Sequence, residues 1–203
     1  MTDASGLLLA QMEPDQLNED EFNDWYDLEH IPQMSSVDGI LGTSRWICVA
    51  GWPRYLAAYD LQSIDVLKSE SYRRATGANF TPWTRRILTR VSGWRRIALG
   101  RLDGAAGGLS PDSGALQLLF VRDASAAAAL VAELGGVPGV AQVRAFTVPD
   151  EGFAVVLVEG GSLLDLPASA PTGVRLTRSA NYVRYERRDP FAAFHAIDCG
   201  EVH

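Results

Sequence analysis

The chain has 203 residues, of which 47% are hydrophobic and 21% are charged. A chain of this length can bury a core without disulfides or metal, and this composition excludes a disordered or fibrous protein. The formal net charge of −7 argues against nucleic acid as the main partner. Because no secretory leader or membrane-length apolar run is present, and Cys48 and Cys199 are the only cysteines, we expect a cytoplasmic protein that does not bind membranes.

In chain order, the first half predicts a strand, a helix, two strands, a second helix and a fourth strand. We expect the strands at about 6–13, 42–50, 54–61 and 89–100, and the helices at about 18–31 and 63–75. Pro32 should end the first helix, because the residue before a proline avoids the helical conformation.

The second half repeats landmarks of the first in the same order. Leu88-Thr-Arg90 with Trp94 and Arg96 recurs as Leu176-Thr-Arg178 with Tyr182 and Arg184 at the same spacing. The repeat predicts two homologous halves. We expect units at 1–102 and 115–190, a Gly/Ser/Pro/Asp-rich linker at 103–114, a tail at 191–203, and helices at 125–134 and, as a vestige, at 162–166.

The order strand, helix, strand, strand, helix, strand in each half predicts an α+β protein made of two ferredoxin-like units. Such a unit covers one sheet face with helices and leaves the other bare. We therefore expect the two units to pack sheet to sheet as an intrachain α/β barrel, a pseudo-dimer within one chain, with a further homodimer possible. Leu8, Ile47, Leu118 and Val156 are the residues expected in the shared layer.

The segment 21–32 carries the most chemistry. At 100° per residue, Trp25, Tyr26 and Glu29 share one stripe of the helix, and His30 lies at its edge. A carboxylate on an apolar face needs a partner or a wet cavity, and Glu29 and the helix C-terminus should raise the pKa of His30. An imidazole, a carboxylate and a phenol together indicate general acid/base catalysis. The same pattern also fits a core Trp25 and a capping or surface His30.

The motif Trp25-Tyr26-Asp-Leu-Glu29-His30-Ile-Pro32, followed by Val37-x-Gly39 and a strand with Arg45, resembles the dimeric α/β-barrel superfamily, most closely its EthD-like branch. The resemblance covers residues 6–100, and in the second half it extends only to the order of the strands. The superfamily includes polyketide cyclases, muconolactone isomerases, monooxygenases that need no metal, and haem-active enzymes. The resemblance implies one active cavity, in the first half, with His30 as the general acid/base.

We expect Tyr26 to donate a hydrogen bond to a substrate oxygen and Glu29 to orient the imidazole. The candidate substrate-binding residues are Trp25, Arg45, Trp46, Tyr59 and Trp83. A structural role for Arg45 and for the tryptophans remains an alternative reading of the same residues.

These residues predict an enzyme without metal or cofactor: a lyase, isomerase or cyclase acting on a small, mostly apolar or aromatic carbonyl compound. One alternative is a monooxygenase of the same fold, either metal-free or haem-dependent. Another is a non-catalytic carrier of a small molecule. The tail contains His195, Cys199 and His203, and we expect it to cover the core edge or a neighbouring subunit rather than bind a metal.

Overall fold

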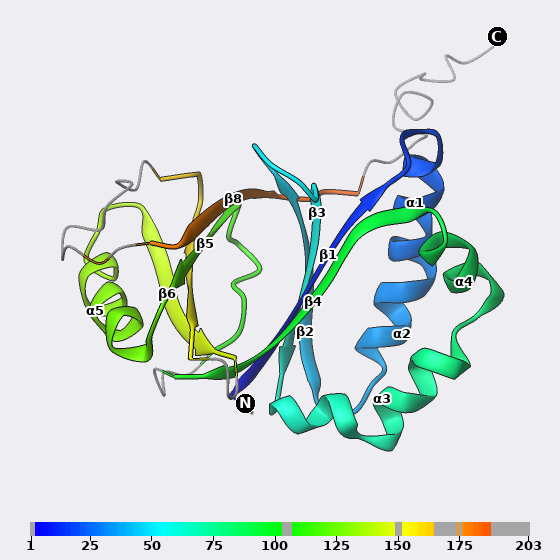
Figure 1. The fold of residues 1–203 in the computed structure, drawn as a ribbon, viewed down its shortest axis with the longest axis horizontal. Coiled ribbons are helices and arrows are strands. Elements are labelled where there is room, and N and C mark those ends of the chain that lie inside the picture. Colours follow the sequence, from blue (N-terminus) through cyan, green and yellow to red (C-terminus); the bar gives the residue numbers. More distant parts are fainter. Residues whose placement is uncertain (1–2, 103–106, 149–151, 165–173, 175, 188–203) are drawn as a thin grey trace, which may run out of the picture.

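Eight antiparallel strands close into a barrel in the order β1-β3-β2-β8-β5-β7-β6-β4 (Figure 1). The computed structural model describes residues 3–102, 107–148, 152–164, 174 and 176–187. The strands are β1 Gly6–Pro14, β2 Ile40–Cys48, β3 Tyr55–Leu61, β4 Val91–Arg101, β5 Ala115–Val121, β6 Val140–Thr147, β7 Ala154–Gly160 and β8 Arg178–Arg184. The predicted α+β fold class is confirmed.

The two halves meet edge to edge. The first half has the strand order β4-β1-β3-β2 and the second β8-β5-β7-β6. One seam pairs Trp46 with Arg184 and Cys48 with Tyr182, and the other pairs Gly100 with Thr147. The barrel therefore closes within one chain through backbone hydrogen bonds between sheet edges, in addition to the side chains that the two sheets enclose.

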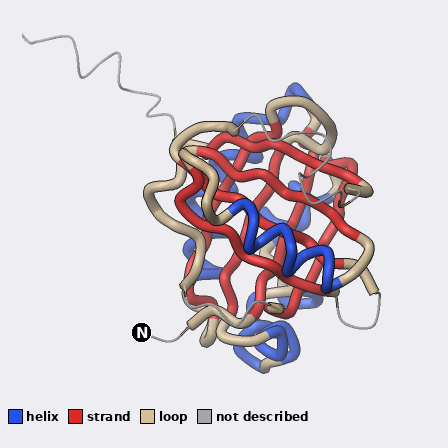
Figure 2. The backbone as a smooth tube through the Cα atoms, turned by 90° about the vertical axis from the view of Figure 1, so that its left-hand side faces the viewer, coloured by secondary structure: helices blue, strands red, loops and turns tan. Residues whose placement is uncertain are grey.

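The helices cover the outside of the barrel. They are η1 Gln16–Asn18, α1 Glu19–Trp25, η2 Tyr26–His30, α2 Ile31–Ser35, η3 Ile64–Lys68, α3 Glu70–Ala75, η4 Gly77–Asn79, α4 Pro82–Leu88 and α5 Ala124–Leu134. Figure 1 shows α1 to α4 on the outer face of the first half and α5 on the opposite side of the barrel. In Figure 2 a helix lies across the strands of the second half. No helix in the described ranges is long and apolar enough to cross a membrane.

The first helix does not end at Pro32, so that prediction is wrong. Residues 26–30 form a π-helical turn in which the Ile31 N–H donates to the Tyr26 carbonyl, five residues earlier. Helix α2 then continues to Ser35. Pro32 is tolerated because it lies in the first turn of α2, where a missing N–H costs little. Helix α4 was not predicted, although Thr81 caps it through its side chain and Pro82 begins it, which is a common start signal.

The strand faces differ from the expected ones. The barrel interior contains Leu7, Leu9, Trp46, Leu56, Leu118, Phe146, Val155, Leu157 and Tyr182. Leu8 and Ile47 instead pack beneath the helices of the first half, and Val156 packs with the α5 residues, so only Leu118 lies in the predicted layer. A shift of one residue reverses the face of every side chain. Every residue of β3 and β7 is buried. The outward-facing positions of these strands therefore cannot be recognised in the sequence as polar positions.

Part of the predicted linker is held against the barrel. The backbone N–H of Leu109 donates to Asp60 at 2.5 Å, and that of Ser110 donates to Glu159 at 2.9 Å. Arg144 joins these two carboxylates, each at 3.0 Å. Residues 161–164 form no helix. The rest of the predicted vestigial helix, residues 103–106 of the linker and the tail 191–203 lie outside the described residues.

Candidate active site

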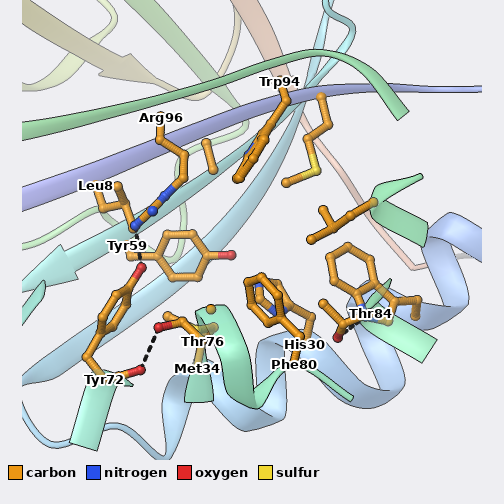
Figure 3. A pocket seen from close by; sticks show the side chains of 15 residues that line it. Leu8, His30, Met34, Tyr59, Tyr72, Thr76, Phe80, Thr84, Trp94 and Arg96 are labelled. Atoms are coloured by element: carbon orange, nitrogen blue, oxygen red, sulfur yellow. Dashed lines mark hydrogen bonds between the residues drawn. The ribbon is translucent and has the colours of Figure 1, made fainter. Parts of the chain in front are cut away.

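A cavity of about 210 Å³ lies between the outer face of the first-half sheet and its helices (Figure 3). Strands β1, β3 and β4 form one wall, and the helices with the segment around η4 form the other. The lining residues are Leu8, Ala10, Met12, Trp25, His30, Met34, Tyr59, Tyr72, Thr76, Gly77, Phe80, Thr84, Leu88, Trp94 and Arg96. Of the predicted site residues, the structure brings His30, Trp25 and Tyr59 to this cavity.

His30 is enclosed by aromatic rings. Its imidazole stacks on Trp25 with ring centroids 4.5 Å apart, and the edge contact with Tyr26 is 5.4 Å between centroids. Its Nδ1 atom is buried and has no hydrogen-bond partner. Burial lowers the pKa of His30 to about 4, although the charge of Glu29 acts in the opposite direction. The expectation of a raised pKa is wrong, because burial dominates and because the helix continues beyond His30, so the imidazole is not at a helix C-terminus.

Glu29 holds the helix that covers the cavity. Its Oε1 accepts hydrogen bonds from the hydroxyls of Thr81 at 2.6 Å and Thr84 at 3.0 Å. The Trp25 indole N–H donates to the Thr84 hydroxyl at 3.0 Å. Glu29 does not line the cavity. These contacts connect the π-helical turn to α4.

Tyr59, rather than Tyr26, presents a hydroxyl to the cavity. The Tyr59 hydroxyl is buried and has no hydrogen-bond partner, and Figure 3 shows it pointing into the open space. Burial raises the pKa of Tyr59 well above its usual value. Tyr26 is not a lining residue, and its hydroxyl lies 3.9 Å from the sulfur of Met12. The neighbouring Tyr26 adds to the rise in the pKa of Tyr59.

The other predicted binding residues lie away from the cavity. Arg45 forms an ion pair with Asp27 at 2.9 Å, and its guanidinium lies over the ring of Tyr185 at 3.9 Å. Trp46 points into the barrel interior, because it follows Arg45 on β2 and adjacent side chains alternate. Trp83 packs against the first-half core without lining the cavity. Arg45, Trp46 and Trp83 therefore do not contact the cavity.

Sequence reasoning missed the polar group at the other end of the cavity. Arg96 donates a hydrogen bond to the Tyr72 hydroxyl, and the Thr76 hydroxyl donates to the Tyr72 carbonyl at 2.8 Å. Arg96 lies opposite Ala10 in the β1–β4 pair. The sequence signal that could have identified Arg96 is its spacing from Trp94, because residues two apart on a strand share one face of the sheet. The small residue Ala10, opposite Arg96, leaves room beside it.

The site does not fit haem. His30 is the only histidine in the described ranges, so no second imidazole there could hold the iron from the other side. The cavity of about 210 Å³ is smaller than the about 300–1,000 Å³ of pockets that hold drug-sized ligands, and haem is at least as large as such a ligand. The described residues also contain no group of three or more side chains suited to hold a metal ion.

Neither a protein-family model nor a curated protein matches the sequence. Solved structures do match the fold. A candidate monooxygenase from Lactobacillus acidophilus NCFM is 11% identical with a TM-score of 0.59, over 88% of this chain and 93% of that one. An anthrone oxidase-like protein is 12% identical with a TM-score of 0.57, over 92% and 94%. A mutant chlorite dismutase from Candidatus Nitrospira defluvii is 12% identical with a TM-score of 0.54, over 92% and 93%. The chain shares the ferredoxin-like α/β fold of these proteins.

Proposed function

We propose that this chain is a cofactor-independent monooxygenase that oxidises a small aromatic compound at an acidic C–H bond, with His30 as the base. The observation that carries this proposal is that His30 lines an apolar cavity while its buried Nδ1 atom has no hydrogen-bond partner. Because the pKa of His30 is lowered to about 4, the imidazole is neutral at pH 7 and free to accept a proton.

The reaction begins with proton transfer to this nitrogen. A CH₂ group next to a carbonyl gives a proton to His30, and the carbonyl oxygen becomes an enolate. Tyr59 is the side chain placed to donate a hydrogen bond to that oxygen. Burial disfavours an imidazolium, but an enolate formed beside it favours the charged form. The base therefore strengthens as the substrate loses its proton.

Dioxygen completes the reaction without another reductant. The enolate carbon forms a C–O bond to O₂, and the proton on His30 passes to the distal oxygen to give a hydroperoxide. Removal of the second proton from the same carbon then breaks the O–O bond and releases water. The sum is CH₂ plus O₂ to C=O plus H₂O, so the carbon supplies all four electrons that O₂ accepts.

Two structural neighbours, a candidate monooxygenase and an anthrone oxidase-like protein, support oxidation over a lyase, isomerase or cyclase reaction. Those reactions begin with the same proton transfer and differ in needing no O₂. We further propose that the first half belongs to the EthD-like branch, supported by the motif from Trp25 to Pro32. The matching strand order of the two halves supports an origin by duplication.

Oxygen uptake with anthrone as the probe tests this function. We expect O₂ consumption by the wild-type chain and a loss of about 10²–10⁴-fold in His30→Gln, the usual contribution of a positioned base. Leu28→Gln is the matched control, because Leu28 is in the same helical turn but 54% exposed, and it should keep full activity. Equal uptake by wild type and His30→Gln would refute the role of His30, and turnover that continues without O₂ would favour the lyase or isomerase.

A further inference from the structure

We infer that the cavity contains an anion-binding subsite formed by Arg96 and Tyr72, and that its ligand is a planar aromatic carboxylate. This inference deepens the proposed function by naming the substrate class, and its reactive consequence rests on that function. The binding itself is independent of any reaction.

The first observation is a cation without an anion. Arg96 forms no ion pair with any carboxylate in the described part of the chain, whereas Arg45, Arg54, Arg90 and Arg144 each do. Its one hydrogen bond goes to the Tyr72 hydroxyl. What distinguishes Arg96 from other arginines without an ion pair is its position, because it lines an apolar cavity where its guanidinium can bind an external anion.

The second observation is the charge of the cavity. None of its lining residues is acidic, and Arg96 is the only one with a permanent charge. A carboxylate bound there would accept charge-assisted hydrogen bonds from a planar guanidinium, which suits two oxygens at once. Arg96 is exposed at the edge of the cavity, so a neutral ligand can also bind there, but it would not gain these charge-assisted hydrogen bonds.

The third observation is a second donor at the same place. Arg96 donates to the Tyr72 oxygen, so the Tyr72 hydroxyl proton remains available for a ligand. The Tyr72 ring is itself held in place, since Arg96 bonds to its hydroxyl and the guanidinium lies 5.8 Å from its ring centre. The two donors are therefore arranged before any ligand binds.

The remaining walls define the body of the ligand. Figure 3 shows Arg96 and Tyr72 on one side of the space, His30 and Phe80 on another, and the Tyr59 hydroxyl pointing between them. Trp94 and Phe80 offer flat apolar surfaces to an aromatic ring. A carboxylate on Arg96 thus places the ring of the ligand toward Tyr59 and His30.

Isothermal titration of the full chain with 2-naphthoate and its neutral isostere 2-naphthamide tests the subsite. We expect wild type to bind the carboxylate about tenfold tighter than the amide, as hydrogen bonds to charged groups allow. Arg96→Gln should abolish this preference and Tyr72→Phe should reduce it. Arg95→Gln is the matched control, because Arg95 is exposed on the same strand as Arg96 is, but lies over Trp52 and does not line the cavity, and it should keep the preference. Thermal melting of each variant verifies folding.

The outcomes separate this inference from the proposed function. An equal affinity of wild type for the two probes would overturn the subsite, and so would an equal loss in Arg95→Gln and Arg96→Gln. His30→Gln should still prefer 2-naphthoate, because His30 is not a ligand of the carboxylate. Carboxylate preference without anthrone oxidation would reject only the proposed reaction, and oxidation without the preference would reject only the subsite.

Discussion

The indole of Trp25 lies nearly flat on the imidazole of His30, with centroids 4.5 Å apart and planes inclined by 18°. Residues five apart in a regular α-helix point about 140° away from each other. The π-helical turn over Tyr26–His30 brings the two side chains to the same side. The stack removes one face of the imidazole from water, which is part of the burial that lowers its pKa.

This burial predicts how stability depends on pH. The pKa of His30 is about 4 in the folded chain and about 6.5 in the unfolded chain. Between these values the unfolded state holds one more proton, so the free energy of unfolding rises with pH. The contribution of His30 is complete above about pH 6.5 and is lost as the pH falls to about 4, by at most about 3 kcal/mol.

Urea unfolding of wild type and His30→Gln at pH 7 and pH 4.5 measures this term, because carboxylates that titrate in the same range cancel in the difference. We expect wild type to lose more stability than His30→Gln on acidification. A smaller loss in wild type would mean that the folded pKa of His30 is not lowered.

Thr84 connects the helix over the cavity to the π-helical turn. Thr84→Val removes the hydroxyl that accepts from Trp25 and donates to Glu29, and leaves a buried indole N–H without a partner. The free energy of unfolding should fall by about 1–3 kcal/mol. The control is Thr89→Val, whose hydroxyl is exposed and bonds a nearby carbonyl; its effect should stay within about 0.5 kcal/mol. Similar losses in both variants, measured by urea unfolding, would contradict this role.

Arg144 neutralises two buried carboxylates. Its guanidinium bonds Asp60 and Glu159, and all three side chains are at most 4% exposed. Arg144→Met should cost about 3–5 kcal/mol in denaturant unfolding, because it leaves two carboxylates buried without a cation. Arg74→Met, which breaks an exposed pair with Glu70, should change stability by less than about 1 kcal/mol. Comparable effects of the two variants would show that the buried network contributes little.

Much of the secondary structure follows from sequence patterns. All of the expected first-half strands occur within a few residues of their predicted ends, because apolar runs bounded by turn residues are local signals. The alanine-rich helix is also present as α5. His30 could be singled out because the chain has only three histidines and because the motif from Trp25 to Pro32 resembles that of a known family.

The orientation of these elements was decided by tertiary structure. Leu8 and Leu9 are equally apolar, yet one faces the helices and the other the barrel interior. Both sides of β1 are covered, so hydrophobicity alone does not distinguish the faces. The same ambiguity left open which side of β2 meets the first helix, and the structure places Arg45 there, against Asp27.

The sequence by itself determined the α+β class and the order of the strands along the chain, since each depends on residues close together in the chain. Only the tertiary structure decided the electrostatics of the site. Arg96 lies 66 positions from His30 in the numbering, and the two share a cavity only after β4 pairs with β1 and the helices cover that face. Burial of the imidazole is likewise a property of the packed molecule, because it depends on side chains that several separate segments supply.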